Sequence, residues 1–162
     1  MQFTIQDNQP HQDCSPFAEL RAEARSNPNA KDSAGFTALM AAVSEHDLAL
    51  FSELLQQGAD VNSRTEDGLT ALIVAAIAAD ERFMTQLIER GADVNARMSD
   101  GTTALMLAAE KCDDDIVALL LGKGVDVNLR DKQGNTAIKR AAKCGKASQR
   151  TLQLLTRAGA LQ

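Results

Sequence analysis

Aromatic side chains are scarce in this sequence. Five phenylalanines make up the 3% aromatic content of the 162 residues, and tryptophan and tyrosine do not occur. Alanine and leucine must therefore supply most of the core, which favours thin, closely packed helices over a sheet sandwich. No apolar run approaches the roughly 18 residues that cross a bilayer, and residues 1–15 lack the basic and apolar regions of a secretory signal. We therefore expect a protein of the cytoplasm, with the nucleus as an alternative.

Reactive side chains are also few. Three cysteines, Cys14, Cys112 and Cys144, are too few and too oddly numbered for a disulfide framework, so a reducing intracellular compartment is the default interpretation. No serine, cysteine or carboxylate constellation converges on His11 or His46, and no histidine follows the cysteines at zinc spacing. The glycines form no clustered phosphate-binding loop. We expect no enzymatic activity, no cofactor, no metal and no small-molecule substrate.

What the sequence does contain is a repeat. A phrase of the form Gly-x-Thr-Ala occurs four times, and its glycines are each 33 residues apart, at Gly35, Gly68, Gly101 and Gly134. A second phrase, Gly-x-Asp-Val-Asn, ends in the same register at Asn62, Asn95 and Asn128, and Asn29 keeps that register too. Because a fixed period held over four copies does not arise by chance, the sequence predicts a repeat architecture.

At these residues the sequence resembles an ankyrin-repeat protein, over about residues 15–162. The resemblance implies an all-α solenoid of stacked helix-turn-helix units with β-hairpin tips. We expect a mobile tail at 1–14, a cap at 15–31, and repeats at about 32–64, 65–97, 98–130 and 131–162. The cap is an incomplete repeat, because Phe17-Ala-Glu-Leu echoes Phe51-Ser-Glu-Leu in the second helix of the next copy. Glycines should end the later second helices in a left-handed conformation, at Gly58, Gly91 and Gly124.

Charge is distributed unevenly along the repeats. Residues 132–162 contain seven basic and no acidic residues, whereas residues 1–131 contain 10 basic and 22 acidic residues. This asymmetry can steer a charged partner or favour head-to-tail self-contact. The alternative is that a terminal repeat simply needs a soluble outer face.

The candidate binding residues come from two groups. A basic column at the repeat tips contains Lys31, Arg64, Arg97 and Arg130, and it either grips carboxylates on a partner or is a solvated framework position. The resemblance further implies that positions varying between copies line a concave binding face, at the tips, after each repeat glycine and at the end of each first helix. The predicted partner-binding residues are Phe36, Arg64, Glu66, Leu69, Ile77, Arg97, Met98, Thr102, Glu110, Lys111 and Arg130.

Asp113, Asp114 and Asp115 suggest a metal site at first sight. Three consecutive helical residues point in different directions, however, and they fall short of a calcium loop. Their place at the start of a predicted second helix suits them to the unpaired N–H groups there. Cys112 and Cys144 occupy near-equivalent positions in adjacent repeats and can approach each other.

The preferred hypothesis is therefore a non-enzymatic, monomeric module that binds a partner protein through its tips and concave helix face, as an adaptor, scaffold or inhibitor. One alternative is an electrostatic binder of acidic protein, nucleic acid or membrane through the basic C-terminal repeat, although we do not expect nucleic acid or membrane as the partner. A metal-dependent hydrolase using Asp113–Asp115 is the other alternative.

Overall fold

The computed structural model of the chain describes residues 17–143, 145 and 149–160. Its helices are α1 (Ala18–Ala24), α2 (Ala38–Ser44), α3 (Leu48–Gln56), α4 (Ala71–Ala78), α5 (Glu81–Glu89), α6 (Ala104–Lys111), α7 (Asp114–Gly122), α8 (Ala137–Ala141) and α9 (Gln149–Arg157). The predicted tail at 1–14 and two of the three cysteines, Cys14 and Cys144, lie outside the described residues. None of the helices in the described ranges has the length and apolar character needed to span a bilayer.

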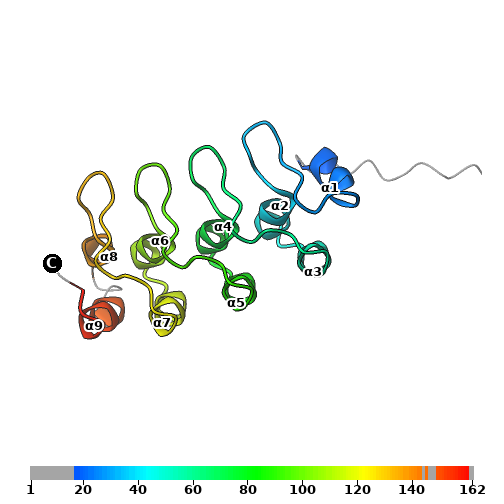
Figure 1. The fold of residues 1–162 in the computed structure, drawn as a ribbon. Helices are drawn as coiled ribbons and strands as arrows, with labels where there is room; N and C mark the ends of the chain where they lie inside the picture. The colour runs from blue at the N-terminus through cyan, green and yellow to red at the C-terminus, as the bar shows by residue number, and fades with distance from the viewer. Residues whose placement is uncertain (1–16, 144, 146–148, 161–162) are drawn as a thin grey trace, which may run out of the picture.

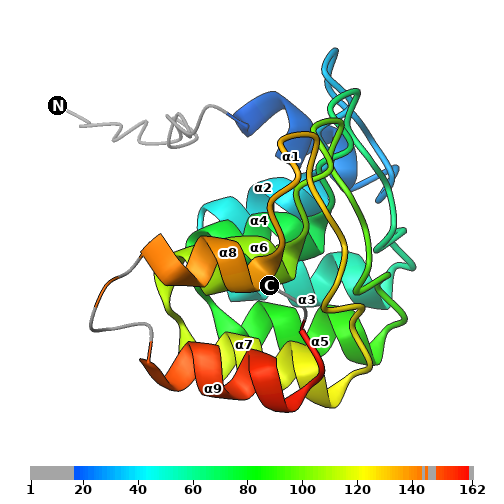
Figure 2. The ribbon, with the colours of Figure 1, turned by 90° about the vertical axis from the view of Figure 1, so that its left-hand side faces the viewer.

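The helices stack in two rows, with loops projecting on one side (Figure 1). The inner row, next to the loops, contains α2, α4, α6 and α8, and the outer row contains α3, α5, α7 and α9. Each inner helix packs on the next inner helix and on the outer helix of its own repeat. Figure 2 shows the two rows one above the other, with the loops lying side by side along one edge. The fold is the all-α solenoid that the repeat frame predicts.

The helices begin where the sequence supplies hydrogen-bond acceptors for their free N–H groups. In the inner row, the hydroxyls of Thr37, Thr70 and Thr103 each accept a hydrogen bond from the backbone N–H three residues later. The distances are 3.2, 3.3 and 3.3 Å. In the outer row, Asp47 and Asp113 cap α3 and α7 in the same way, at 3.0 and 3.1 Å. Threonine and aspartate are strong helix N-caps, so the repeated sequence fixes where each helix starts.

Alanine allows the inner helices to approach one another closely. Four alanines spaced by 33 residues are completely buried, at Ala42, Ala75, Ala108 and Ala141. Met40, Ile73 and Met106, which are also spaced by 33 residues, are each at most 1% exposed and add larger apolar side chains to this packing. Lys139, at the same position of the last repeat, is exposed.

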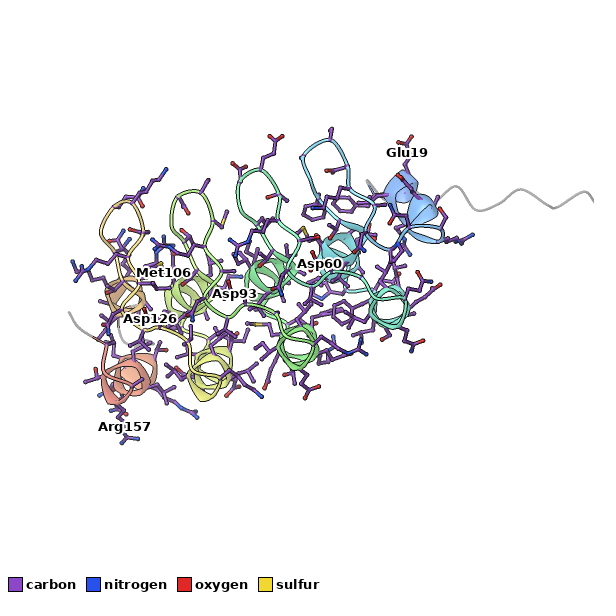
Figure 3. The ribbon with its side chains drawn as sticks, viewed as in Figure 1. Glu19, Asp60, Asp93, Met106, Asp126 and Arg157 are labelled. Atoms are coloured by element: carbon purple, nitrogen blue, oxygen red, sulfur yellow. The ribbon has the colours of Figure 1, made fainter. Side chains whose placement is uncertain are left out.

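The loops are tied from one repeat to the next. Asn29, Asn62 and Asn95 each accept a hydrogen bond through Oδ1 from the backbone N–H of the aspartate 31 residues later, at 2.7, 2.8 and 2.7 Å. These aspartates, Asp60, Asp93 and Asp126, follow one another along the stack (Figure 3). The tips are loops with isolated bridges between Lys31 and Thr37 and between Arg97 and Thr103, and the described residues contain no strand.

Helix α1 does not occupy the place that its sequence suggests. Although Phe17-Ala-Glu-Leu echoes an outer helix, α1 packs on α2 and lies beside it in Figure 1, out of line with α3. The ring of Phe17 stacks on Phe36 at 5.0 Å, whereas Phe51 meets Phe83 edge-on at 4.8 Å. The guanidinium of Arg21 holds α1 there through the loop between α2 and α3, where it pairs with Glu45 and Asp47 at 2.8 and 2.7 Å.

Candidate binding surface

The end of each inner helix offers side chains to solvent at one equivalent position per repeat. These positions are Ser44, Ile77, Glu110 and Lys143, and all four are exposed. Ile77 is 47% exposed, and in the described part of the chain it is the only large apolar side chain that is exposed. The ammonium of Lys111 donates to the carbonyl oxygen of Ile77, so this lysine lies across the end of α4. The structure thus brings three predicted residues, Ile77, Glu110 and Lys111, to adjoining helix ends.

The basic column of the tips is part of the framework. Arg64 donates to the carbonyl oxygen of Arg97 at 3.4 Å and pairs with Asp93 at 3.3 Å. Arg97 in turn donates to the carbonyl oxygen of Arg130 at 2.6 Å, and Arg130 donates to Gly134 at 3.2 Å. Successive tips are therefore held in register by these guanidinium groups. The side chains stay exposed, so the column can still meet a partner while it supports the tips.

The remaining predicted residues differ in how much surface they offer. Glu66 is exposed at its tip, whereas Leu69 and Met98 are partly buried against the core. Phe36 is partly covered by the ring of Phe17. Thr102 is only 3% exposed, and its hydroxyl is hydrogen-bonded within the protein, so it offers almost no surface for binding.

Arg140 is a residue whose role the sequence does not reveal. Its guanidinium, 13% exposed, pairs with Glu110 and Asp131 at 2.8 Å each, and it donates to the hydroxyl of Thr102 at 2.9 Å. Arg140 therefore joins the fourth repeat to the third. By its position in the sequence, Arg140 belongs to the basic C-terminal cluster, but in the structure two carboxylates neutralise its charge. This pairing weakens the case for that cluster as an anion-binding site.

The Asp131 carboxylate is fully buried beneath this arginine. Burial favours the neutral acid, but hydrogen bonds from Arg140 and Asn135 outweigh it and lower the pKa of Asp131 to about 2. The equivalent positions of the preceding repeats hold Met98, Thr65 and Asp32. What sets Asp131 apart in the sequence is that it directly precedes a run of basic residues without a further acid, and this is the signal that points to a buried pair.

A second carboxylate has its pKa lowered at the junction of the first two repeats. Asp80 is 7% exposed and contacts Arg82 at 2.9 Å and His46 at 3.2 Å. The hydrogen bond from Arg82 is the main cause that lowers the pKa of Asp80 to about 2, with His46 adding to it and burial opposing it. Asp80 also caps α5 through the backbone N–H of Arg82, at 3.0 Å, so its role here is structural.

The three consecutive aspartates are not gathered around one point. Asp113 caps α7, and Asp114 accepts a hydrogen bond from the hydroxyl of Thr151 at 2.5 Å. Within the described residues, no group of three or more histidine, cysteine, aspartate or glutamate side chains is placed to hold a metal ion. Cys112 is disulfide-bonded, and its partner lies outside the described residues. This disulfide contradicts the interpretation, based on the few cysteines, that the protein is in a reducing compartment.

The candidate surface thus consists of repeat tips joined by arginine contacts and of the adjoining helix ends, where Ile77 is exposed among charged neighbours. A family model described as ankyrin repeats (three copies) matches the chain twice, over residues 11–98 and 77–160. No curated protein matches it. Between them the two matches span the whole described solenoid, and the repeat frame, the helix pairs and the loop ties agree with them. The chain belongs to the ankyrin-repeat family.

Proposed function

We propose that this protein is a non-enzymatic module that binds a partner protein on the face made by the tips and the ends of the inner helices. Ankyrin repeats generally mediate protein–protein interaction. The observation that carries the proposal is the exposure of Ile77, because the other large apolar side chains in the described part of the stack are partly or fully buried. Burying an isoleucine is favourable, so an exposed one with charged groups around it suits the centre of an interface.

Rigidity supports the same proposal. The tips are joined by the asparagine ties and by the arginine contacts from one tip to the next. A surface that is already ordered loses little conformational entropy when it binds, so more of the contact energy appears as affinity. Such a surface can act as an adaptor, a scaffold or an inhibitor, depending on what the partner presents.

Affinity capture from the native cell tests the proposal. Ile77→Glu should lower recovery of the specific partners about tenfold or more, because it puts a charge where an apolar contact forms. The control is Ala118→Glu, which introduces the same side chain at an exposed position of the outer helix α7. Both variants should keep the unfolding temperature of the wild type, since neither position is buried. Equal recovery by both variants would show that the binding face lies elsewhere.

A further inference from the structure

The two ends of the outer row expose side-chain positions that are buried in the middle of the stack. At the first end, Leu50 of α3 is only partly buried, whereas its equivalents 33 and 66 residues later, Phe83 and Ile116, are at most 1% exposed. The last repeat is two residues longer, since Gly159 follows Gly124 by 35 residues, so the equivalents of Leu152 in α9 are Val117 and Met84. Leu152 is partly buried, whereas Val117 and Met84 are completely buried. Each end therefore presents one half of the contact that joins neighbouring outer helices.

The first end is a groove between α1 and α3, with a volume of about 550 Å³. It exists because α1 packs on α2 and leaves the adjacent side of α3 uncovered. Alanines and leucines make much of its lining, and Arg21 and Glu53 stand among its polar residues. The apolar residues that line the groove are Ala18, Ala22, Ala24, Ala49, Leu50 and Leu54.

The last end is a shallower depression on α9, of about 430 Å³, lined by Leu152, Gln153, Thr156, Arg157 and Gln149. The contact between α3 and α5 shows what these two surfaces fit. There Phe51, the equivalent of Leu152, meets Phe83, the equivalent of Leu50, at 4.8 Å between ring centroids. The α9 surface and the α1–α3 groove thus match the two sides of the contact that joins neighbouring outer helices within the stack.

Charge complements the shapes. Residues 17–64, which include both walls of the groove, contain seven acidic and four basic residues, whereas residues 131–162 contain one acidic and seven basic residues. In the groove, Arg21 and Arg25 are balanced by Asp47 and Glu53, and Arg157 lines the α9 depression. Figure 3 shows Arg157 at the α9 end of the molecule and Glu19 at the α1 end, with the whole stack between them. Two copies that meet end to end therefore bring opposite charges together.

We propose that the α9 end of one molecule docks in the α1–α3 groove of a second copy, with Leu152 packing near Leu50. This contact joins unlike surfaces, so it leaves a free groove and a free α9 end on the pair and can extend into chains. It goes beyond the proposed function and does not involve Ile77. It adds a concentration-dependent association to the monomer that the sequence predicts.

Sedimentation velocity of the purified protein over a wide concentration range tests this inference. The average mass should rise with concentration, and added salt should oppose the rise because charges contribute. Ala49→Arg places a long cation in the groove, and Leu152→Glu places a charge on the α9 surface. Each variant alone should associate about tenfold more weakly or not at all. Gln56→Arg, on an exposed position of α3 that does not line the groove, is the matched control and should associate like wild type.

Mixing the two blocked variants gives the decisive result. The Ala49→Arg protein keeps its α9 end and the Leu152→Glu protein keeps its groove, so an equal mixture should form one-to-one dimers that do not grow further. Thermal unfolding of each variant checks that it is folded, and Ala22→Arg on the other wall of the groove serves if Ala49→Arg is not. A wild type that stays monomeric, association that survives both changes, or a mixture that forms no dimer would each overturn the inference. Ile77→Glu should leave all of these results unchanged, which separates them from partner binding.

Discussion

The third and fourth repeats share one sequence frame but are held in place by different forces. In the third repeat, Thr103 caps α6, and Met106 is buried against the neighbouring helices. In the fourth, Lys139 takes the place of that methionine and is exposed, and α8 has no side-chain cap among the described residues. Besides its buried apolar residues, the fourth repeat has a polar attachment in Arg140 and its two carboxylates. A repeat at the end of a stack has a neighbour on one side only, so a specific polar contact can carry much of its attachment.

The largest effect should come from removing that contact. Arg140→Ala leaves the fully buried Asp131 carboxylate without its cation, and breaking a buried pair on one side costs about 3–5 kcal/mol. Lys139→Ala, one residue away and exposed, should change stability by no more than about 0.5 kcal/mol. Urea unfolding measures both, and hydrogen exchange should show the loss concentrated in α8 and α9. Equal stability of the two variants would mean that the buried pair does not hold the last repeat.

A second comparison uses two glycines of the same frame. Gly68 and Gly134 have φ values of +77° and +76°, so alanine is strained at either position. A Cβ at Gly68 would also lie 2.8 Å from the carbonyl oxygen of Arg97, whereas a Cβ at Gly134 meets nothing within 4 Å. Gly134→Ala should therefore cost about 1 kcal/mol for the backbone alone, and Gly68→Ala about 2–3 kcal/mol because the next tip must also move.

Urea unfolding of these two alanine variants separates strain from crowding. If both lost the same stability, contact between adjacent tips would not matter. A larger loss at Gly134 than at Gly68 would contradict the tip spacing seen in the structure.

The two acids with lowered pKa values predict how stability depends on pH. Asp131 and Asp80 both fall from an ordinary value of 3.8 to about 2 in the folded protein. Each contribution is fully present above the unfolded pKa and is lost as the pH falls from about 5 toward 2, and it amounts to about 2 kcal/mol. Asp131→Asn and Asp80→Asn should each flatten the acid side of the stability curve, measured by thermal unfolding between pH 2 and 7. A curve as steep as that of the wild type would show that the acid concerned is not stabilised by its partners.

The parts of the fold that the sequence predicts are those set by local chemistry. The 33-residue frame gives the helix pairs, and Gly58, Gly91 and Gly124 have the positive φ expected where the outer helices end. The asparagine ties follow from the same frame. By contrast, His46, Ala79 and Cys112 also adopt positive φ at the ends of inner helices. No glycine stands at these positions, so the sequence does not indicate that the backbone turns there.

The parts that the sequence does not predict depend on partners far along the chain. The place of α1 is set by Arg21 and two acids 24 and 26 residues away, and repeat spacing carries no information about such a contact. From the sequence alone Arg140 is interpreted as a surface charge, because its contact with Asp131 is seen only in the folded structure. Among the candidate binding residues, Ile77 is exposed as expected from its place at a helix end, while Thr102 is drawn into the Arg140 network.

The smallest predicted change in stability concerns the N-caps of the inner helices in the third and fourth repeats. The Thr103 hydroxyl accepts a hydrogen bond from Met106 N at 3.3 Å, whereas the buried Thr136 hydroxyl has no partner among the described residues. Thr103→Val should therefore lose about 1 kcal/mol, and Thr136→Val should be neutral or slightly stabilising because it removes an unpaired buried hydroxyl. Urea unfolding of the two valine variants checks the pair, with methyl for hydroxyl the same exchange in each. A loss at Thr136 equal to that at Thr103 would mean that α8 is capped like α6, and that the two repeats begin their inner helices in the same way.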